Sequence, residues 1–154
     1  MPGRIDARLG ELGIVLPDAP APAANYIPFV RAGALVHVSG QISRDAAGLT
    51  CGRLGADMDV AAGAAAARSC ALALIAQLRA ACGGDLDRLV RVVKLTGFVA
   101  STADFTDQPK VINGASDLMV AVFGEAGRHA RSAVGVAALP LGVAVEIEAI
   151  FEVA

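Results

Sequence analysis

An apolar, alanine-rich stretch constrains the fold more than any other feature of this sequence, and it runs from Val60 to Leu78. A membrane-spanning helix needs roughly 20 nearly uninterrupted apolar residues, whereas Arg68 lies near the middle of the stretch and Arg79 follows it. About half of the stretch is alanine and glycine, which favour membrane insertion much less than leucine does. We therefore predict a long core helix in a protein that makes no membrane contact.

This predicted helix has a sequence signal at each end. Asp57 or Asp59 can cap its first turn, and Gly83 and Gly84 follow its last turn near Cys82. Its many alanines favour the helical state and let a neighbouring surface approach closely. Its buried stripe is expected to comprise Leu74, Ile75, Leu78 and Cys82.

Length and composition indicate one folded domain. The chain has 154 residues, of which 55% are hydrophobic and 18% charged, a balance opposite to that of disordered chains. We interpret residues 1–154 as a single domain, with residues 1–20 as an N-terminal extension. The mean hydropathy is +0.59, yet a domain of this size buries only roughly 68–70% of its unfolded surface by itself. The excess of small apolar residues therefore predicts burial in an oligomer.

Charge and cysteine usage exclude several classes of function. The net charge is −2 and aromatic residues make up 4%, which leaves little to neutralise phosphates or stack bases, so we predict no nucleic-acid partner. The N-terminus lacks the apolar core of a signal peptide, and we expect a cytoplasmic protein. Cys51, Cys70 and Cys82 are then reduced thiols, and two isolated histidines, His37 and His129, predict no metal site.

Periodicity and turn residues predict an α+β fold around the long helix. The other expected elements are a short helix at 4–12, a hairpin with strands at 26–30 and 34–39, a central strand at 89–99, a second main helix at 109–123 and final strands at 131–136 and 143–153. Residues 41–55 are predicted as a loop. The two main helices would pack on one face of a mixed β-sheet, with the short N-terminal helix outside that pair.

Arg131 is the first candidate for chemistry, because it opens an otherwise apolar strand. A guanidinium in such a place is costly unless an anion pairs with it. Two interpretations stay open. One is a structural ion pair with a carboxylate of the same chain, and the other is a planar binding fork for the carboxylate of a ligand.

Glu146 and Glu148 form a second candidate, because residues two apart on a strand share one face. Two like charges there raise each other's pKa unless cations or water relieve them. Arg91 or Lys94 could pair with one of the carboxylates. The other carboxylate could then orient a water molecule or transfer a proton.

Three groups of residues resemble the RidA family, also called the YjgF or L-PSP family. The C-terminal group has an arginine before a small residue, then a Leu-Pro pair and aliphatic-Glu-aliphatic-Glu, and it comprises Arg131, Ser132, Val134, Ala137, Leu139, Val145, Glu146, Ile147 and Glu148. The other groups comprise Val38, Ser39, Gly40, Gln41 and Ile42, and then Val92, Val93, Lys94, Phe98, Asp104, Phe105 and Asn113. These matches follow the family's order from about Pro22 onward, and the chain is identified as a member of this family.

The resemblance implies a RidA/chorismate-mutase-like α+β fold and a homotrimer with ligand sites in the clefts between subunits. It also implies hydrolysis of reactive 2-imino or 2-enamino acids to 2-keto acids and ammonia, without a cofactor. Arg131 would hold the substrate carboxylate, the backbone around Ala133 would line the pocket, and Glu146 would position or activate water. An imine is already electrophilic, so such a site need only orient it, favour the iminium form and supply water.

Departures from the family pattern indicate a divergent branch. Phe29 follows a proline where deaminases of the family usually carry a tyrosine, and Tyr26 lies three residues earlier. His129 lies two residues before Arg131, where proline or alanine is more common. The segment that precedes Asn113 is longer, and the N-terminal helix is additional. Besides Arg131 and Glu146, the candidate ligand-binding residues are Ser39, Gly40, Tyr26, Phe29, Asn113, Ala133 and His129.

Some of these candidates have a structural interpretation that stays open. Ser39 could donate to a ligand or form a turn before Gly40, and His129 could transfer a proton in the pocket or lie in a surface turn. Two functions of different class also stay open. One is imine and enamine hydrolysis, and the alternative is a non-catalytic trimer that binds a small carboxylate or another metabolite. The acidic charge balance disfavours ribonuclease activity.

Overall fold

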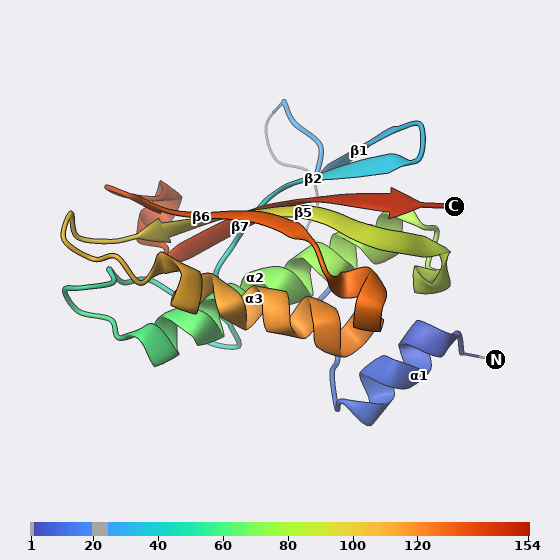
Figure 1. Cartoon of the computed structure of the whole chain (residues 1–154), viewed down its shortest axis with the longest axis horizontal. Helices are drawn as coiled ribbons and strands as arrows, with labels where there is room; N and C mark the ends of the chain where they lie inside the picture. The colour runs from blue at the N-terminus through green and yellow to red at the C-terminus, as the bar shows by residue number, and fades with distance from the viewer. Residues whose placement is uncertain (1, 20–24) are drawn as a thin grey trace.

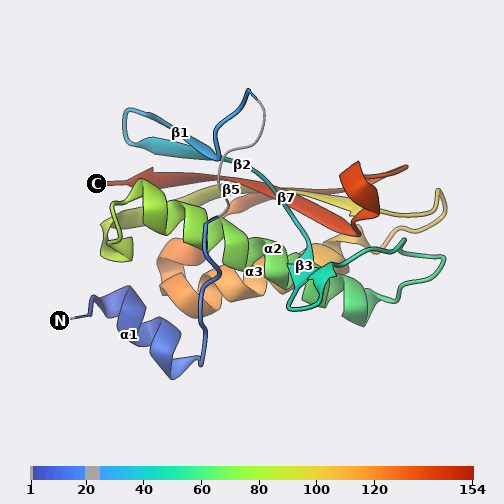
Figure 2. The same ribbon diagram turned by 180° about the vertical axis from the view of Figure 1, so that it is seen from behind.

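A five-stranded mixed sheet carries two long helices on one face, as Figures 1 and 2 show from opposite sides. The computed structural model describes residues 2–19 and 25–154; Pro22, where the family resemblance begins, lies outside them. The strand order is β1-β2-β7-β5-β6, with β1 at Phe29–Ala32, β2 at Leu35–Ile42, β7 at Val145–Val153, β5 at Leu89–Ala100 and β6 at Ala130–Val136. The predicted α+β class and helix arrangement are confirmed.

The alanine-rich stretch forms α2 (Val60–Ala81), which packs against the sheet beside α3 (Gln108–Phe123). Asp59 caps α2 by accepting a hydrogen bond from the backbone N–H of Ala62 at 2.8 Å. α2 is long and apolar enough to pass for a membrane span, but 56% of its most apolar window is buried inside the protein. A Cβ at Gly114 of α3 would collide with the backbone of Ala64, so glycine permits the close crossing of the two helices.

Side-chain alternation divides the sheet into a helix-covered face and an open face. On β7, Val145 and Ile147 are fully buried toward the helices, whereas Glu146 and Glu148 point to the other side, as their spacing predicts. We call that other side the open face, because the structure describes no element that covers it. Its apolar side chains stay accessible to solvent, among them Val30, Leu35 and Val134.

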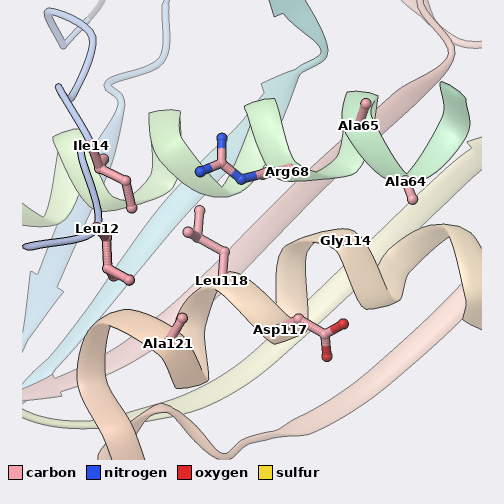
Figure 3. A pocket seen from close by; sticks show the side chains of 9 residues that line it. All are labelled: Leu12, Ile14, Ala64, Ala65, Arg68, Gly114, Asp117, Leu118 and Ala121. Atoms are coloured by element: carbon pink, nitrogen blue, oxygen red, sulfur yellow. The ribbon is translucent and has the colours of Figure 1, made fainter. Parts of the chain in front are cut away.

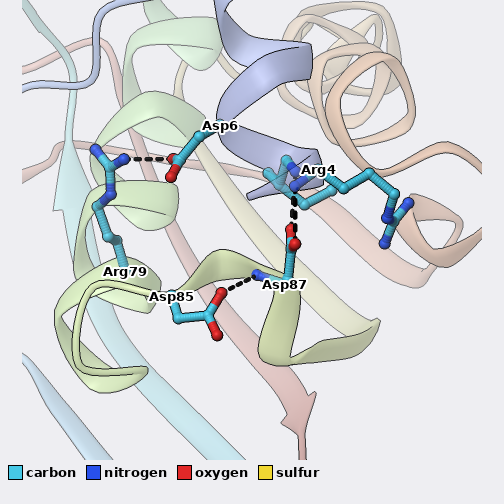
Figure 4. Close-up of polar contacts among 6 residues, drawn as sticks. Arg4, Asp6, Arg79, Asp85 and Asp87 are labelled. Carbon is cyan, nitrogen blue, oxygen red and sulfur yellow. Dashed lines mark hydrogen bonds and ion pairs between the residues drawn. The ribbon is translucent and has the colours of Figure 1, made fainter. Parts of the chain in front are cut away.

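The short N-terminal helix α1 (Arg4–Glu11) lies on the outside of the helix layer (Figure 2) and takes its cap from a distant residue. Its own N-cap residue is a glycine without a capping side chain. Asp87 of η1 (Leu86–Arg88) accepts the backbone N–H groups of Arg4 and Ile5, both at 2.8 Å (Figure 4). These hydrogen bonds lower the pKa of the Asp87 carboxyl. An ion pair between Asp6 and Arg79 adds a second attachment.

One of the following details agrees with the sequence-based expectations and two differ from them. The strand predicted at 89–99 is β5, an inner strand between β7 and the edge strand β6. The predicted loop at 41–55 contains the end of β2 and a small hairpin of β3 (Arg44–Asp45) and β4 (Gly48–Leu49). The first hairpin strand begins at Phe29, so Tyr26 precedes it and lies outside the strand. Cys70 and Cys82 are buried, as expected, whereas Cys51 is exposed.

Candidate functional site

Arg131 lies on β6, at one edge of the sheet, and its side chain reaches α3. Its Nη1 donates hydrogen bonds to Asn113 Oδ1 at 2.8 Å and to Ser116 Oγ at 3.1 Å. Both acceptors are neutral, and no ion pair involves Arg131 within residues 2–19 and 25–154. The structural ion pair that the sequence left open is therefore absent there. The guanidinium is held in place, but its charge is not neutralised.

His129 extends this arrangement by a second pair of hydrogen bonds. Its Nδ1 lies 2.6 Å from the carbonyl oxygen of Gly127, and its Nε2 lies 2.9 Å from Ser116 Oγ. A carbonyl oxygen can only accept, so Nδ1 carries the hydrogen, and in the neutral ring Nε2 accepts from the Ser116 hydroxyl. The Ser116 oxygen is then free to accept from Arg131. We call Asn113, Ser116, His129, Arg131 and Ala133 the β6-edge cluster.

Ala133 belongs to this cluster through its place on the strand. It lies two residues after Arg131, on the same face, and packs partly buried against the core. β6 is the last strand in the sheet order, so its outer edge has no strand neighbour in the described part of the chain. The backbone groups along this edge are thus accessible beside the guanidinium.

Glu146 lies on the open face, next to the bulge of β2. A Cβ at Gly40 would collide with its carboxylate, so the glycine makes room for this side chain. Ser39 Oγ donates to the carbonyl oxygen of Ile27 at 2.8 Å, which gives Ser39 the structural role considered from the sequence. Phe29 is half-buried against the core, and Tyr26 is 57% exposed.

Partial burial raises the pKa of the Glu146 carboxyl above its ordinary value of 4.5, and the like charge of Glu148 raises it further. The predicted pairing of these acids with Arg91 or Lys94 is wrong. The register sets Arg91 opposite Glu152 and Lys94 opposite Ile150 instead. Phe29 pairs with the buried Val38 and so points to the helix-covered face, and Tyr26 lies before the first strand. We call Ser39, Gly40 and Glu146 the open-face cluster.

The two clusters lie on opposite faces of the sheet within one protomer. Arg131 is paired with Leu95, which is buried toward the helices. Glu146 is paired with Phe98, whose other partner is Val134 on the open face. Because β5 lies between β6 and β7, the two backbones are roughly 10 Å apart as well. One protomer therefore does not bring Arg131 and Glu146 onto the same small molecule.

A hollow of about 430 Å³ on the outer helix surface contains none of the predicted site residues. It lies between α2, α3 and the chain that follows α1, and Arg68 and Asp117 project from different helices at its rim (Figure 3). The described residues also contain no group of His, Cys, Asp and Glu that could hold a metal ion.

Ser116 is the site residue that sequence reasoning missed. Its signal was a spacing of three from Asn113, which puts both on one helix face.

Comparisons with known proteins agree with this architecture. Residues 6–152 match the family model described as "YjgF/chorismate mutase-like, putative endoribonuclease". The chain belongs to this family, which includes the RidA proteins.

Individual relatives show how the chain relates to the rest of the family. Protein TCP17 from Trypanosoma cruzi is 56% identical over 152 residues, which are 97% of this chain and 94% of that protein. The structure of Atu1372 from Agrobacterium tumefaciens has a TM-score of 0.90 at 50% identity, covering 97% of this chain and 92% of that one. For the YjgF product of E. coli the TM-score is 0.59 at 30% identity, with 88% and 93% covered. The chain thus resembles Atu1372 more closely than YjgF itself.

Proposed function

We propose that this protein hydrolyses 2-imino and 2-enamino acids to 2-keto acids and ammonia, at sites between the subunits of a cytoplasmic homotrimer. One observation carries the proposal. Arg131 is fixed by Asn113 and Ser116 through Nη1, while its Nε and Nη2 make no hydrogen bond in the described part of the chain. Arginine with free, coplanar donors binds carboxylates in a bidentate manner. A 2-imino acid supplies such a carboxylate.

The opposite placement of the clusters supports a site shared between copies. The β6-edge cluster of one protomer would face the open-face cluster of a neighbour, which brings Arg131 and Glu146 of different chains onto one substrate. The open face carries exposed apolar side chains, Val30 and Val134 among them, which a neighbour would bury. Three such contacts related by a threefold axis close into a ring.

In this site each residue has a distinct role. Arg131 binds the carboxylate and thereby sets the position of the neighbouring C2 atom. Glu146 accepts a proton from water as the water oxygen bonds to C2 of the imine, and it returns this proton to the substrate nitrogen, which takes the electron pair of the C=N bond. The hydroxyl proton of the resulting carbinolamine then moves to the nitrogen as the C2–N bond breaks, which releases ammonia and leaves the keto acid. The raised pKa of Glu146 suits a group that takes up and returns a proton.

A coupled assay tests this function. A dehydratase that releases 2-aminoacrylate is mixed with micromolar protein, and pyruvate formation is followed with lactate dehydrogenase. We expect faster pyruvate formation with the wild type and none above background with Arg131→Ala. Glu152→Gln is the matched control, because Glu152 lies on the same strand and face but farther from Glu146. Absence of acceleration by the wild type would overturn the proposal.

A second candidate is binding of small carboxylates without turnover. The predicted ligand-binding residues favour it, because Phe29 has no hydroxyl and the Ser39 hydroxyl is bonded to Ile27. Thermal stabilisation by 2-ketobutyrate that Arg131→Ala abolishes, together with no acceleration in the coupled assay, would establish this alternative.

A further inference from the structure

A cavity of about 290 Å³ lies where β5 and β6 end and α3 begins. Its wall includes Arg53, Ser101, Gln108 and Gly135. None of these residues belongs to the β6-edge cluster or to the open-face cluster. The cavity is therefore a feature that the proposed function does not use.

The Ser101 hydroxyl lies on the wall of this cavity without a hydrogen-bond partner. The residue is 6% exposed, and its Oγ makes no hydrogen bond within residues 2–19 and 25–154. A Cβ built at Gly135 would lie 2.6 Å from Ser101 Oγ and 2.7 Å from Gln108 Nε2. The hydroxyl and the amide therefore pack together against the backbone of Gly135. A ligand oxygen in the cavity could accept a hydrogen bond from this hydroxyl.

Glycine at 135 lets these two groups approach the strand, and backbone conformation does not explain it. Gly135 is absent from the glycines whose φ lies in the left-handed region, so its backbone would accept another residue. An alanine methyl would collide with Ser101 Oγ and Gln108 Nε2 and displace both groups. The strand therefore holds two polar side chains together on the cavity wall, and we call this part of the wall the cradle.

The surroundings of the cradle favour a negative charge. Arg53 is exposed and forms no ion pair in the described part of the chain. Gln108 is the first residue of α3, and the N-cap residue Asp107 makes no side-chain hydrogen bond to that helix end. An uncapped helix N-terminus presents N–H groups and a positive partial charge.

Two nearby carboxylates keep their negative charge, but each already has a partner of its own. Asp107 lies 3.4 Å from Lys110 Nζ. Asp57 accepts the backbone N–H of Arg53 at 2.6 Å. Gln108 Nε2 donates one hydrogen to the carbonyl oxygen of Phe105 at 2.8 Å, so its second hydrogen remains for the cradle.

We propose that this cavity binds a small oxyanion, a carboxylate or a phosphate group. The Ser101 hydroxyl and the Gln108 amide donate to its oxygens, and Arg53 supplies a positive charge at the entrance. The volume is near the lower end for ligand pockets, which fits a small ion or the anionic group of a metabolite.

An NMR titration tests the proposal without reference to catalysis. The protein carries Arg131→Ala, so that the β6-edge cluster contributes no anion binding. Amide shifts are followed during titration with sodium phosphate and, separately, sodium acetate at constant ionic strength set with chloride. We expect saturable shifts at 101, 108 and 135 with one of the two anions, which also distinguishes phosphate from carboxylate.

Variants then locate the site. Gly135→Ala should weaken binding by roughly tenfold or more, since its methyl group displaces both donors. Ser101→Ala should weaken it as well, and this variant replaces Gly135→Ala if the latter does not fold. Arg44→Gln is the matched control, an exposed arginine outside the cavity, and should leave the affinity unchanged. Unsaturable shifts with both anions, or wild-type affinity in both Gly135→Ala and Ser101→Ala, would overturn the proposal.

Discussion

The β6-edge cluster and the open-face cluster differ in how their charges are satisfied. Arg131 is fixed by neutral acceptors on α3, so a rigid cation remains without a counter-charge. Glu146 is half-buried beside another acid, which raises its pKa, so an acidic group remains beside a like charge. Each cluster lacks the charge that the other possesses. The difference indicates that the two surfaces complement each other between copies of the chain, because the sheet separates them within one copy.

Mixing two inactive variants would test this complementarity most directly. Arg131→Ala and Glu146→Gln should each reduce the rate of imine hydrolysis by about 10²-fold or more, because each removes one half of the site. After subunit exchange in a 1:1 mixture, about a quarter of the sites should combine an intact Arg131 with an intact Glu146. Recovery of about a quarter of the wild-type activity is expected in the coupled assay.

The control for this experiment mixes each variant with itself under the same exchange conditions. Size-exclusion chromatography with light scattering establishes that subunits assemble and exchange. If exchange occurs but activity does not return, both groups must act from the same chain, and the shared site is wrong.

A conservative change at Arg131 separates charge from geometry in the β6-edge cluster. Arg131→Lys keeps the positive charge, but a single ammonium does not present two coplanar donors to a carboxylate while bonding to Asn113. We expect the KM for the imino acid to rise by roughly 10–100-fold with a smaller loss of kcat. An unchanged KM would show that charge alone is sufficient at this position.

Much of the helix layer was predictable from sequence, because its signals are local. The cap at Asp59 and the apolar stretch determine α2, and alternation along β7 separates Val145 and Ile147 from Glu146 and Glu148. The family resemblance added the residues of the candidate site. These signals need only neighbouring positions along the chain.

The relation between the clusters was not predictable, because it depends on long-range pairing. β5 pairs with β6 in parallel through the α3 crossover, and this pairing determines which face Arg131 occupies. The local sequence around Glu146 does not determine the order of the strands in the sheet. The attachment of α1 was missed for the same reason, since Asp87 caps a helix 82 residues earlier in the chain.

The Ser116 hydroxyl should contribute a smaller, measurable effect within the β6-edge cluster. Ser116→Ala removes the bridge between His129 and Arg131, which frees the guanidinium to rotate. We expect a several-fold rise in KM, of about the size that one hydrogen bond contributes, with kcat little changed. Ser116→Thr retains the hydroxyl and should restore KM. If both variants behave alike, the hydroxyl has only a packing role.

The smallest effect is expected from the open-face carboxyl, as a change in how stability depends on pH. Because the pKa of Glu146 is raised in the folded protein, the folded state binds this proton more tightly than the unfolded chain does. The ionised Glu146 carboxylate destabilises the folded protein. This destabilisation is absent below the ordinary pKa of 4.5 and develops as the pH rises through that value. Glu146→Gln should therefore match the wild-type Tm near pH 4 and exceed it increasingly toward pH 7, measured by differential scanning fluorimetry. Glu148→Gln removes only the weaker of the two causes and should give a smaller gain. Parallel Tm profiles for Glu146→Gln and the wild type would mean that the carboxyl is as well solvated folded as unfolded, and the contrast between the two clusters would then reduce to Arg131 alone.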